Sequence, residues 1–150
     1  MKTAIIYSSV HHGNTKKILE AMFAGKDVSI LPASVNTHPD LTGYDLICFA
    51  SGIYYGKFHK TVLDAMKNCA VKPGQKAILV YTSGSENIRL DSAESILKER
   101  ELINLGHYGC LGFDTFGPLK LIGGLAKGHP DAEELENAKK FINGIEAVLQ

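Results

Sequence analysis

The sequence predicts an α/β fold in which helices cover both faces of a parallel, doubly wound β-sheet. Apolar runs such as Leu46–Ala50 and Ala77–Tyr81 lack polar alternation, which is typical of strands buried on both faces. Segments with helical spacing of apolar residues separate these runs, as in successive βα units. The length of 150 residues suits a single domain, residues 1–150, and no internal repeat or low-complexity tract interrupts it.

The first half of the chain is expected to hold three strands and two helices. A polar loop precedes the first helix, where Asn14 or Thr15 can cap the N-terminus. The second helix stops before Pro73-Gly74, a turn signal that a helix does not pass through. In order, the expected bounds are Thr3–Tyr7 (strand), Asn14–Phe23 (helix), Val28–Leu31 (weak strand), Leu46–Ala50 (strand) and 58–69 (helix).

The second half repeats the alternation and ends in the clearest helix. Ala77–Tyr81 is the fourth strand, a third helix around Ile96 is expected to end near Gly106, and His107–Leu111 is a poorer fifth strand. In the last helix Pro130 suits the first turn, where acidic residues also favour the positive end of the dipole. Its core stripe comprises Leu135, Ala138, Phe141, Ile142, Ile145 and Leu149.

Composition and charge exclude several classes of function. The net charge is zero, with 16 basic and 16 acidic residues, which argues against nucleic acid as a partner. Apolar runs of about five residues are too short for a membrane span, and the start Met1-Lys2-Thr3 lacks a signal pattern, so we expect a cytoplasmic protein. The three cysteines are expected to be reduced and structural, and no metal-ligand spacing appears.

Three polar loops follow the first, third and fourth strands: 8–15, 51–59 and 82–87. Parallel strands bring such loops to one edge of the sheet, where ligands bind. The first loop leads into a helix N-terminus, which can hold a phosphate. The second has two adjacent tyrosines between glycines, and the third offers small residues with accessible backbone groups. Together they predict a site for a mononucleotide with a flat ring system.

At this point the chain resembles the flavodoxin family over essentially its whole length. Family members carry a loop S/T-x-T-G-x-T that wraps the phosphate of FMN, and Gly13-Asn14-Thr15 matches its G-x-T part. Val10 and His12 stand where the family has hydroxyl side chains. The second loop, SGIYYGKFH, is similar to that of flavodoxin-domain oxidoreductases of the menaquinone-dependent protoporphyrinogen oxidase type.

The resemblance implies a flavodoxin-like five-stranded sheet of order 2-1-3-4-5 and a bound FMN. Phosphate binding is expected to involve one of the two histidines, and one tyrosine is expected to stack on the ring, with Tyr55 favoured because it precedes Gly56. His59 is expected at the start of the second helix and no catalytic residue is assigned. The expected cofactor-binding residues are Ser8, Ser9, His11, His12, Gly13, Asn14, Thr15, Ser51, Gly52, Tyr54, Tyr55, Gly56, Thr82, Ser83 and Gly84.

The leading functional hypothesis is an FMN-binding redox protein that transfers electrons to or from a partner protein. An alternative is an FMN-dependent oxidoreductase acting on a small substrate or a quinone, which the second loop and the neutral charge favour. A third is a non-redox binding module on the same fold. The protein is expected to be a monomer or a homodimer. The long connection 113–129 either packs under the last helix or forms a docking surface.

Overall fold

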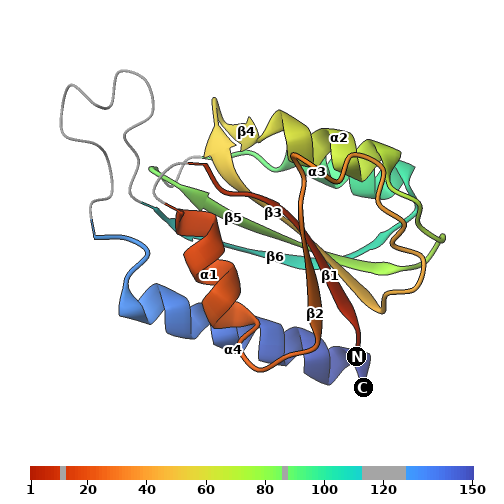
Figure 1. Cartoon of the computed structure of the whole chain (residues 1–150). Helices are drawn as coiled ribbons and strands as arrows, with labels where there is room; N and C mark the ends of the chain where they lie inside the picture. Colours follow the sequence, from red (N-terminus) through yellow and green to blue (C-terminus); the bar gives the residue numbers. More distant parts are fainter. Residues whose placement is uncertain (11–12, 86–87, 113–127) are drawn as a thin grey trace.

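The computed structural model describes residues 1–10, 13–85, 88–112 and 128–150. One sheet runs through the molecule with strand order β2-β1-β3-β5-β6, and all four pairings along it are parallel (Figure 1). The elements are β1 (Thr3–Ser8), α1 (Asn14–Met22), β2 (Val28–Pro32), β3 (Leu46–Tyr54), β4 (Lys57–Phe58), α2 (Lys60–Asn68), β5 (Lys76–Ser83), α3 (Asp91–Glu99), β6 (Ile103–Leu111) and α4 (Ala132–Leu149). The predicted fold class and the predicted order of the five main strands are confirmed.

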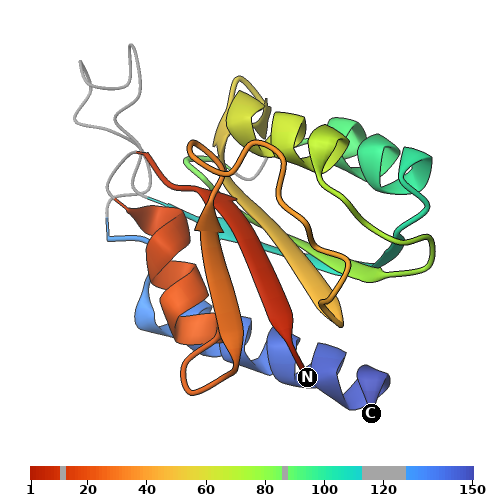
Figure 2. The ribbon, with the colours of Figure 1, turned by 45° about the vertical axis from the view of Figure 1, so that its right-hand side comes forward.

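Helices α1 and α4 cover one face of the sheet (Figures 1 and 2). Successive side chains of a strand point to opposite faces, so Ile5 and Ile78 belong to this side. They pack with Ile18 of α1 and Ile142 of α4, each completely buried. The predicted apolar stripe of the last helix is confirmed, since its members are all buried or partly buried in this layer.

Helices α2 and α3 cover the opposite face. Here Ile6 of β1 and Phe49 of β3, both with no exposed surface, pack against Val62 of α2 and Leu97 of α3. The central strands β1, β3 and β5 therefore lie between two apolar layers, which explains why they read as unbroken apolar runs. Because helices cover both faces of the sheet, a ligand site can form at the carboxyl edge, where the loops after the strands meet.

The third predicted helix ends earlier than expected. It stops at Glu99, and Gly106 lies inside β6 rather than at the helix end. Glu101 adopts a φ of 57°, which turns the chain, and Ile103 then pairs with Lys76. The strand is therefore longer than predicted; its first residues were missed because β6 is a partly exposed edge strand with a register shift.

Two further boundaries differ from the prediction. The third strand continues past Ala50 to Tyr54 and folds back onto β4 as an antiparallel hairpin, so part of the expected second loop is strand. Pro130 precedes the last helix instead of occupying its first turn, because Asp131 is the N-cap. Asp131 accepts from the Glu134 N–H, while Glu134 accepts from the Asp131 N–H, completing a capping box. In the described residues, no helix has the length and apolar character that crossing a membrane requires.

Candidate functional site

The three predicted loops meet at the carboxyl edge of the sheet. They enclose a narrow crevice of about 20 Å³ between the ends of β1, β3 and β5. The residues that line it are Ser9, Val10, Asn14, Thr15, Gly52, Ile53, Tyr54, Thr82, Ser83 and Gly84. The crevice as it stands is far smaller than a drug-sized ligand. A flat ring would therefore lie along its mouth or require the lining side chains to move.

The first loop leads into α1, whose N-cap residue has no side chain to cap the helix. Gly13 is the N-cap residue and has left-handed backbone angles, φ 63° and ψ 27°, which favour glycine. Ser9 Oγ accepts from the Lys16 N–H at 3.2 Å, which folds the loop back over the first turn. The first turn of α1 contains no acidic residue, so no side-chain carboxylate there offsets the positive end of the helix dipole. This end of the site is suited to an anion.

A buried hydrogen bond joins the first loop to the third. Thr15 Oγ1 and Thr82 Oγ1 lie 2.8 Å apart, and the two residues are only 1% and 4% exposed. Thr15 is in the first turn of α1 and Thr82 is near the end of β5, 67 positions away in sequence. The hydroxyl pair therefore sets the spacing between the helix N-terminus and the loop after β5.

The end of β6 abuts the same two loops. The Gly112 N–H donates to the Ser83 carbonyl at 2.8 Å. A Cβ at Gly112 would lie 2.8 Å from Nδ2 of Asn14, closer than such atoms approach in proteins. Only glycine lets the chain leave β6 this close to Asn14. Sequence reasoning missed Gly112, although a glycine at a strand end is a signal for close backbone approach.

The second loop is mostly a tight hairpin between β3 and β4. Tyr54 pairs with Lys57, leaving Tyr55 and Gly56 as a two-residue turn with φ values of 51° and 78°. Positive φ at both positions matches a type I′ turn, which is usually made by Asn-Gly or Asp-Gly. Tyrosine in this position is uncommon and places a large side chain, 89% exposed, at the hairpin tip.

Ser51 and His59 hold the base of this hairpin. Ser51 is completely buried, and its hydroxyl accepts from the His59 N–H at 2.8 Å and donates to the Gly52 carbonyl. His59 is the N-cap of α2, and its Nδ1 accepts from the Thr61 N–H at 3.1 Å. The expected place of His59 at the start of the second helix is confirmed.

Tyr54 lies back over the crevice. Its ring meets the His59 ring edge-on, with centroids 5.2 Å apart and planes at 83°. A Cβ at Gly52 would lie 3.2 Å from the Tyr54 hydroxyl, so the phenol covers this glycine. Tyr54 therefore occupies the place where the mouth of the crevice meets the hairpin.

The structure brings together eight of the expected cofactor-binding residues in the crevice lining: Ser9, Asn14, Thr15, Gly52, Tyr54, Thr82, Ser83 and Gly84. Five others stand close by in the chain without lining it: Ser8, Gly13, Ser51, Tyr55 and Gly56. His11 and His12 lie outside the described residues, as does most of the long connection. Their contacts with a ligand, and those of the tyrosines, stay predictions.

A second polar cluster at the start of α4 was not foreseen. The Glu134 carboxylate accepts from the Leu111 N–H at 2.9 Å and also pairs with Nδ1 of His129. This hydrogen bond raises the pKa of His129. His129, Asp131 and Glu134 each offer a potential ligand atom within 4.8 Å of the others. Their mutual hydrogen bonds and the capping box account for the arrangement.

The cysteines provide no reactive group near the crevice. All three are free thiols, and burial raises the pKa of Cys48 well above its usual range. Burial, reinforced by the Glu134 charge, raises the pKa of Cys110 to about 12. Thiols with raised pKa values are protonated at neutral pH and poorly nucleophilic. This agrees with the structural role expected for them.

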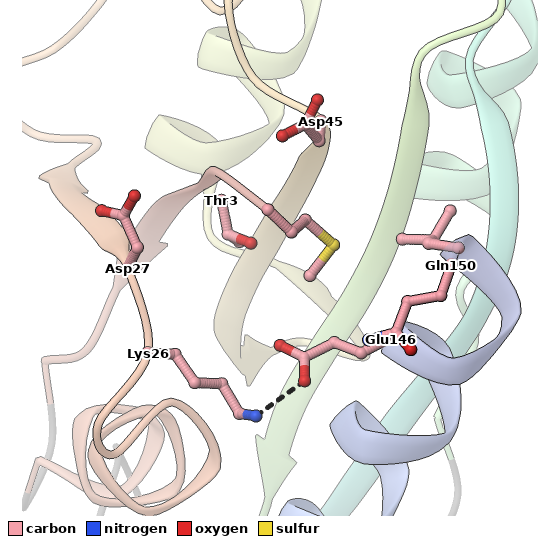
Figure 3. A pocket seen from close by; sticks show the side chains of 8 residues that line it. Thr3, Lys26, Asp27, Asp45, Glu146 and Gln150 are labelled. Atoms are coloured by element: carbon pink, nitrogen blue, oxygen red, sulfur yellow. Dashed lines mark hydrogen bonds and ion pairs between the residues drawn. The ribbon is translucent and has the colours of Figure 1, made fainter.

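A larger cavity lies at the opposite end of the sheet. It has a volume of about 650 Å³ and lies where β1 begins and α4 ends (Figure 3). Lys26 and Glu146 form an ion pair of 2.8 Å across it, and Asp27 and Asp45 also line it. Ligands of open parallel sheets bind at the carboxyl ends of the strands, and this cavity faces the amino ends. The crevice is therefore the better candidate site.

Comparison with known proteins identifies the family of the chain. The model of a family described as "Flavodoxin domain" matches residues 4–86, which include all three loops. An uncharacterised protein of Methanocaldococcus jannaschii is 34% identical over 148 residues, covering 97% of this chain and 98% of that protein.

Solved structures share the fold at low sequence identity. A flavodoxin from the domain Archaea superimposes with a TM-score of 0.68 at 16% identity, covering 99% of both chains. The apo form of an NADH:FMN oxidoreductase superimposes with a TM-score of 0.66 at 12% identity, covering 99% of this chain and 90% of that one.

Proposed function

Because the chain belongs to the flavodoxin-domain family, we propose that it binds FMN along the mouth of the crevice and exchanges electrons with a partner protein. The observation that carries the proposal is the hydrogen-bonded junction of the first and third loops at Thr15 and Thr82, beside an α1 N-terminus whose N-cap residue, Gly13, has no side chain to cap it. FMN supplies the redox chemistry when bound, and the chain binds and orients it.

The phosphate end of FMN fits the first loop. Among the described residues beyond its chain neighbours, no atom lies within 4 Å of a Cβ built at Gly13, which leaves space for an anion outside this turn. The positive end of the α1 dipole and the backbone N–H groups of its first turn favour a phosphate there. Ser9 stands beside this turn, and its hydroxyl can turn to a phosphate oxygen once it exchanges its contact with Lys16.

We place the ring end of FMN at the mouth of the crevice, between the β3–β4 hairpin and the loop after β5. Tyr54 offers an aromatic face on one side, and Thr82–Gly84 bring small side chains and backbone groups on the other. Because Tyr54 covers Gly52 and the crevice is narrow, we infer that Tyr54 rotates away from Gly52 when the ring is bound. Tyr54 is half-buried, so part of its side chain already faces solvent.

The test is titration of the purified protein with FMN. We expect binding of one FMN per chain, seen as a perturbed flavin absorbance spectrum and quenched flavin fluorescence. At a free FMN concentration 100 times the Kd, binding stabilises the fold by about 2.7 kcal/mol, which raises the Tm by roughly 5–10 °C. A protein that leaves the flavin spectrum and its own Tm unchanged would be a non-redox module, and the proposal would fail.

A second candidate is an FMN-dependent oxidoreductase. The similarity in fold to an NADH:FMN oxidoreductase and the zero net charge favour it. The two candidates separate in a turnover assay with the FMN-loaded protein, NADH or NADPH, and a soluble quinone. Steady consumption of both substrates by the loaded protein, at a rate that scales with protein concentration, supports the enzyme. Absence of turnover, combined with electron exchange with a protein partner, supports the carrier.

A further inference from the structure

The charges of this chain are segregated although they sum to zero. Between residues 46 and 85 the sequence has five lysines and a single acidic residue, Asp64. Residues 131–136, at the start of α4, contain four acidic residues and no basic one. Helices α2 and α4 lie on opposite faces of the sheet (Figure 1). The surface formed by the β3–β4 hairpin and α2, with Lys57, Lys60 and Lys67 against Asp64, is therefore positive, and we call it the positive face. The start of α4 is negative.

The positive face contains an apolar groove of about 580 Å³ between the β3–β4 hairpin and α2, which we call the β4–α2 groove. Phe58 and Leu63 contribute buried and half-buried apolar surface to it. Val10 and Tyr55 add strongly exposed apolar surface, 59% and 89%. Apolar side chains that remain in water beside a groove are typical of a surface that a partner covers.

Lysines surround this apolar surface. Lys57, Lys60 and Lys67 all line the groove and are all exposed. Lys60 is partly neutralised by Asp64, at 2.6 Å on the next turn of α2. Within the ranges described above, Lys57 and Lys67 form no ion pair with the rest of the chain. Two lysine charges are thus available to an acidic partner, and the third can exchange its intramolecular acid for a partner's.

The groove is continuous with the crevice. Val10 and Tyr54 line both. A protein seated in the groove would therefore stand beside the ring end of the proposed FMN site. Tyr54 would separate the partner from the ring by one side chain. This places the positive face at the edge where electrons would enter or leave.

We propose that the β4–α2 groove docks an acidic redox protein. An apolar centre with a charged rim is the anatomy of a protein–protein interface. Nucleic acid is disfavoured, because three lysines neutralise few phosphates and apolar surface lies where phosphates would run. The docking part stands on the groove itself, whereas the electron-exchange part rests on the proposed FMN function.

The experiment measures electron transfer by stopped flow from the FMN-loaded, fully reduced protein to excess oxidised cytochrome. Cytochrome b5 serves as the acidic acceptor and cytochrome c as the basic one. Each haem iron takes one electron, Fe(III) to Fe(II), so one reduced flavin reduces two cytochromes and releases two protons as it returns to FMN. We expect faster transfer to cytochrome b5 at low salt, with a rate constant that falls steeply as salt is added.

The test variant carries Lys57→Glu, Lys60→Glu and Lys67→Glu. It should lower the second-order rate constant with cytochrome b5 at least about 10-fold at low salt and raise that with cytochrome c. The matched control carries Lys98→Glu, Lys139→Glu and Lys140→Glu, which make the same change of net charge at exposed positions outside the groove. We expect the control to alter either rate less than about 3-fold. Equal effects of the two variants would overturn the proposal, because net charge alone would then explain the rates.

Docking is also measured without flavin. In ¹⁵N-labelled protein titrated with unlabelled cytochrome b5, backbone amide shifts should move along 57–67 and not along α4. Failure to bind FMN with these shifts intact would reject the proposed function and keep the docking surface. Shifts spread evenly over the surface would reject the docking surface. A third outcome would also reject the docking surface. If the test variant loses binding to phosphatidylserine vesicles but still binds cytochrome b5 unchanged, the lysines serve a membrane and not a protein partner.

Discussion

The hydroxyl pair of Thr15 and Thr82 provides the sharpest test of how the site is built. The two oxygens are 2.8 Å apart, and both residues are almost completely buried. Replacing either threonine by valine keeps the side-chain shape and leaves the other hydroxyl buried without its partner. The loss of one partner of a buried hydrogen bond costs about 1–3 kcal/mol. For a domain of this size, such a cost lowers the Tm by roughly 2–10 °C.

The double variant Thr15→Val/Thr82→Val removes both polar groups and leaves nothing unsatisfied. Its cost should therefore be less than the sum of the two single costs by about 1 kcal/mol or more. Urea unfolding followed by far-UV circular dichroism measures the free energy of unfolding of all three variants. Thr37→Val is the control at an exposed threonine, and its free energy of unfolding should lie within about 0.5 kcal/mol of that of the natural protein. Single variants as stable as the natural protein, or strictly additive costs, would refute the reasoning.

FMN affinity of the same variants separates two roles of Thr15. If its hydroxyl only supports the loops, the double variant should bind FMN better than either single variant. The double variant leaves no buried hydroxyl without a hydrogen-bond partner, so its loops are less disturbed. If the hydroxyl also donates to the phosphate, every variant that lacks it should bind FMN more weakly by a similar factor, about 10–150-fold for one hydrogen bond to a charged group. A fluorescence titration reports both outcomes.

Three further outcomes follow from the geometry. Gly109→Ala places a Cβ 1.8 Å from a ring carbon of Tyr81 and should lower the free energy of unfolding in urea by about 1–3 kcal/mol. If the same substitution costs as much in a Tyr81→Ala background, the clash with the ring is not the cause. His59→Ala removes the N-cap of α2 and should cost about 0.5–2 kcal/mol, whereas His59→Asn, which can cap, should recover most of it; equal losses would show that the cap contributes nothing. The Glu134 hydrogen bond raises the pKa of His129 above 6.5. The stabilisation that this bond gives the fold is therefore complete below pH 6.5 and is lost as the pH rises through the raised pKa. NMR titration should find the His129 pKa lowered in Glu134→Gln, and an unshifted pKa in the natural protein would contradict the prediction.

The main elements could be predicted because their patterns are local. Strands such as Ala77–Tyr81 are apolar throughout because both faces are covered, and the last helix repeats apolar residues with a helical period. Edge strand β6 was predicted too short, since only one of its neighbours is a strand and its first residues are exposed. The hairpin was missed because Tyr55-Gly56 lacks the asparagine or aspartate that usually marks a type I′ turn.

The sequence alone determined the fold class, the chain order of the elements and the three loops that build the site. These follow from residue periodicity and from the rule that parallel strands end at a common edge. Only the tertiary structure decided the contacts between those loops. The Thr15–Thr82 hydrogen bond and the passage of Gly112 beside Asn14 join residues far apart in the chain, and no local pattern encodes which distant side chains meet.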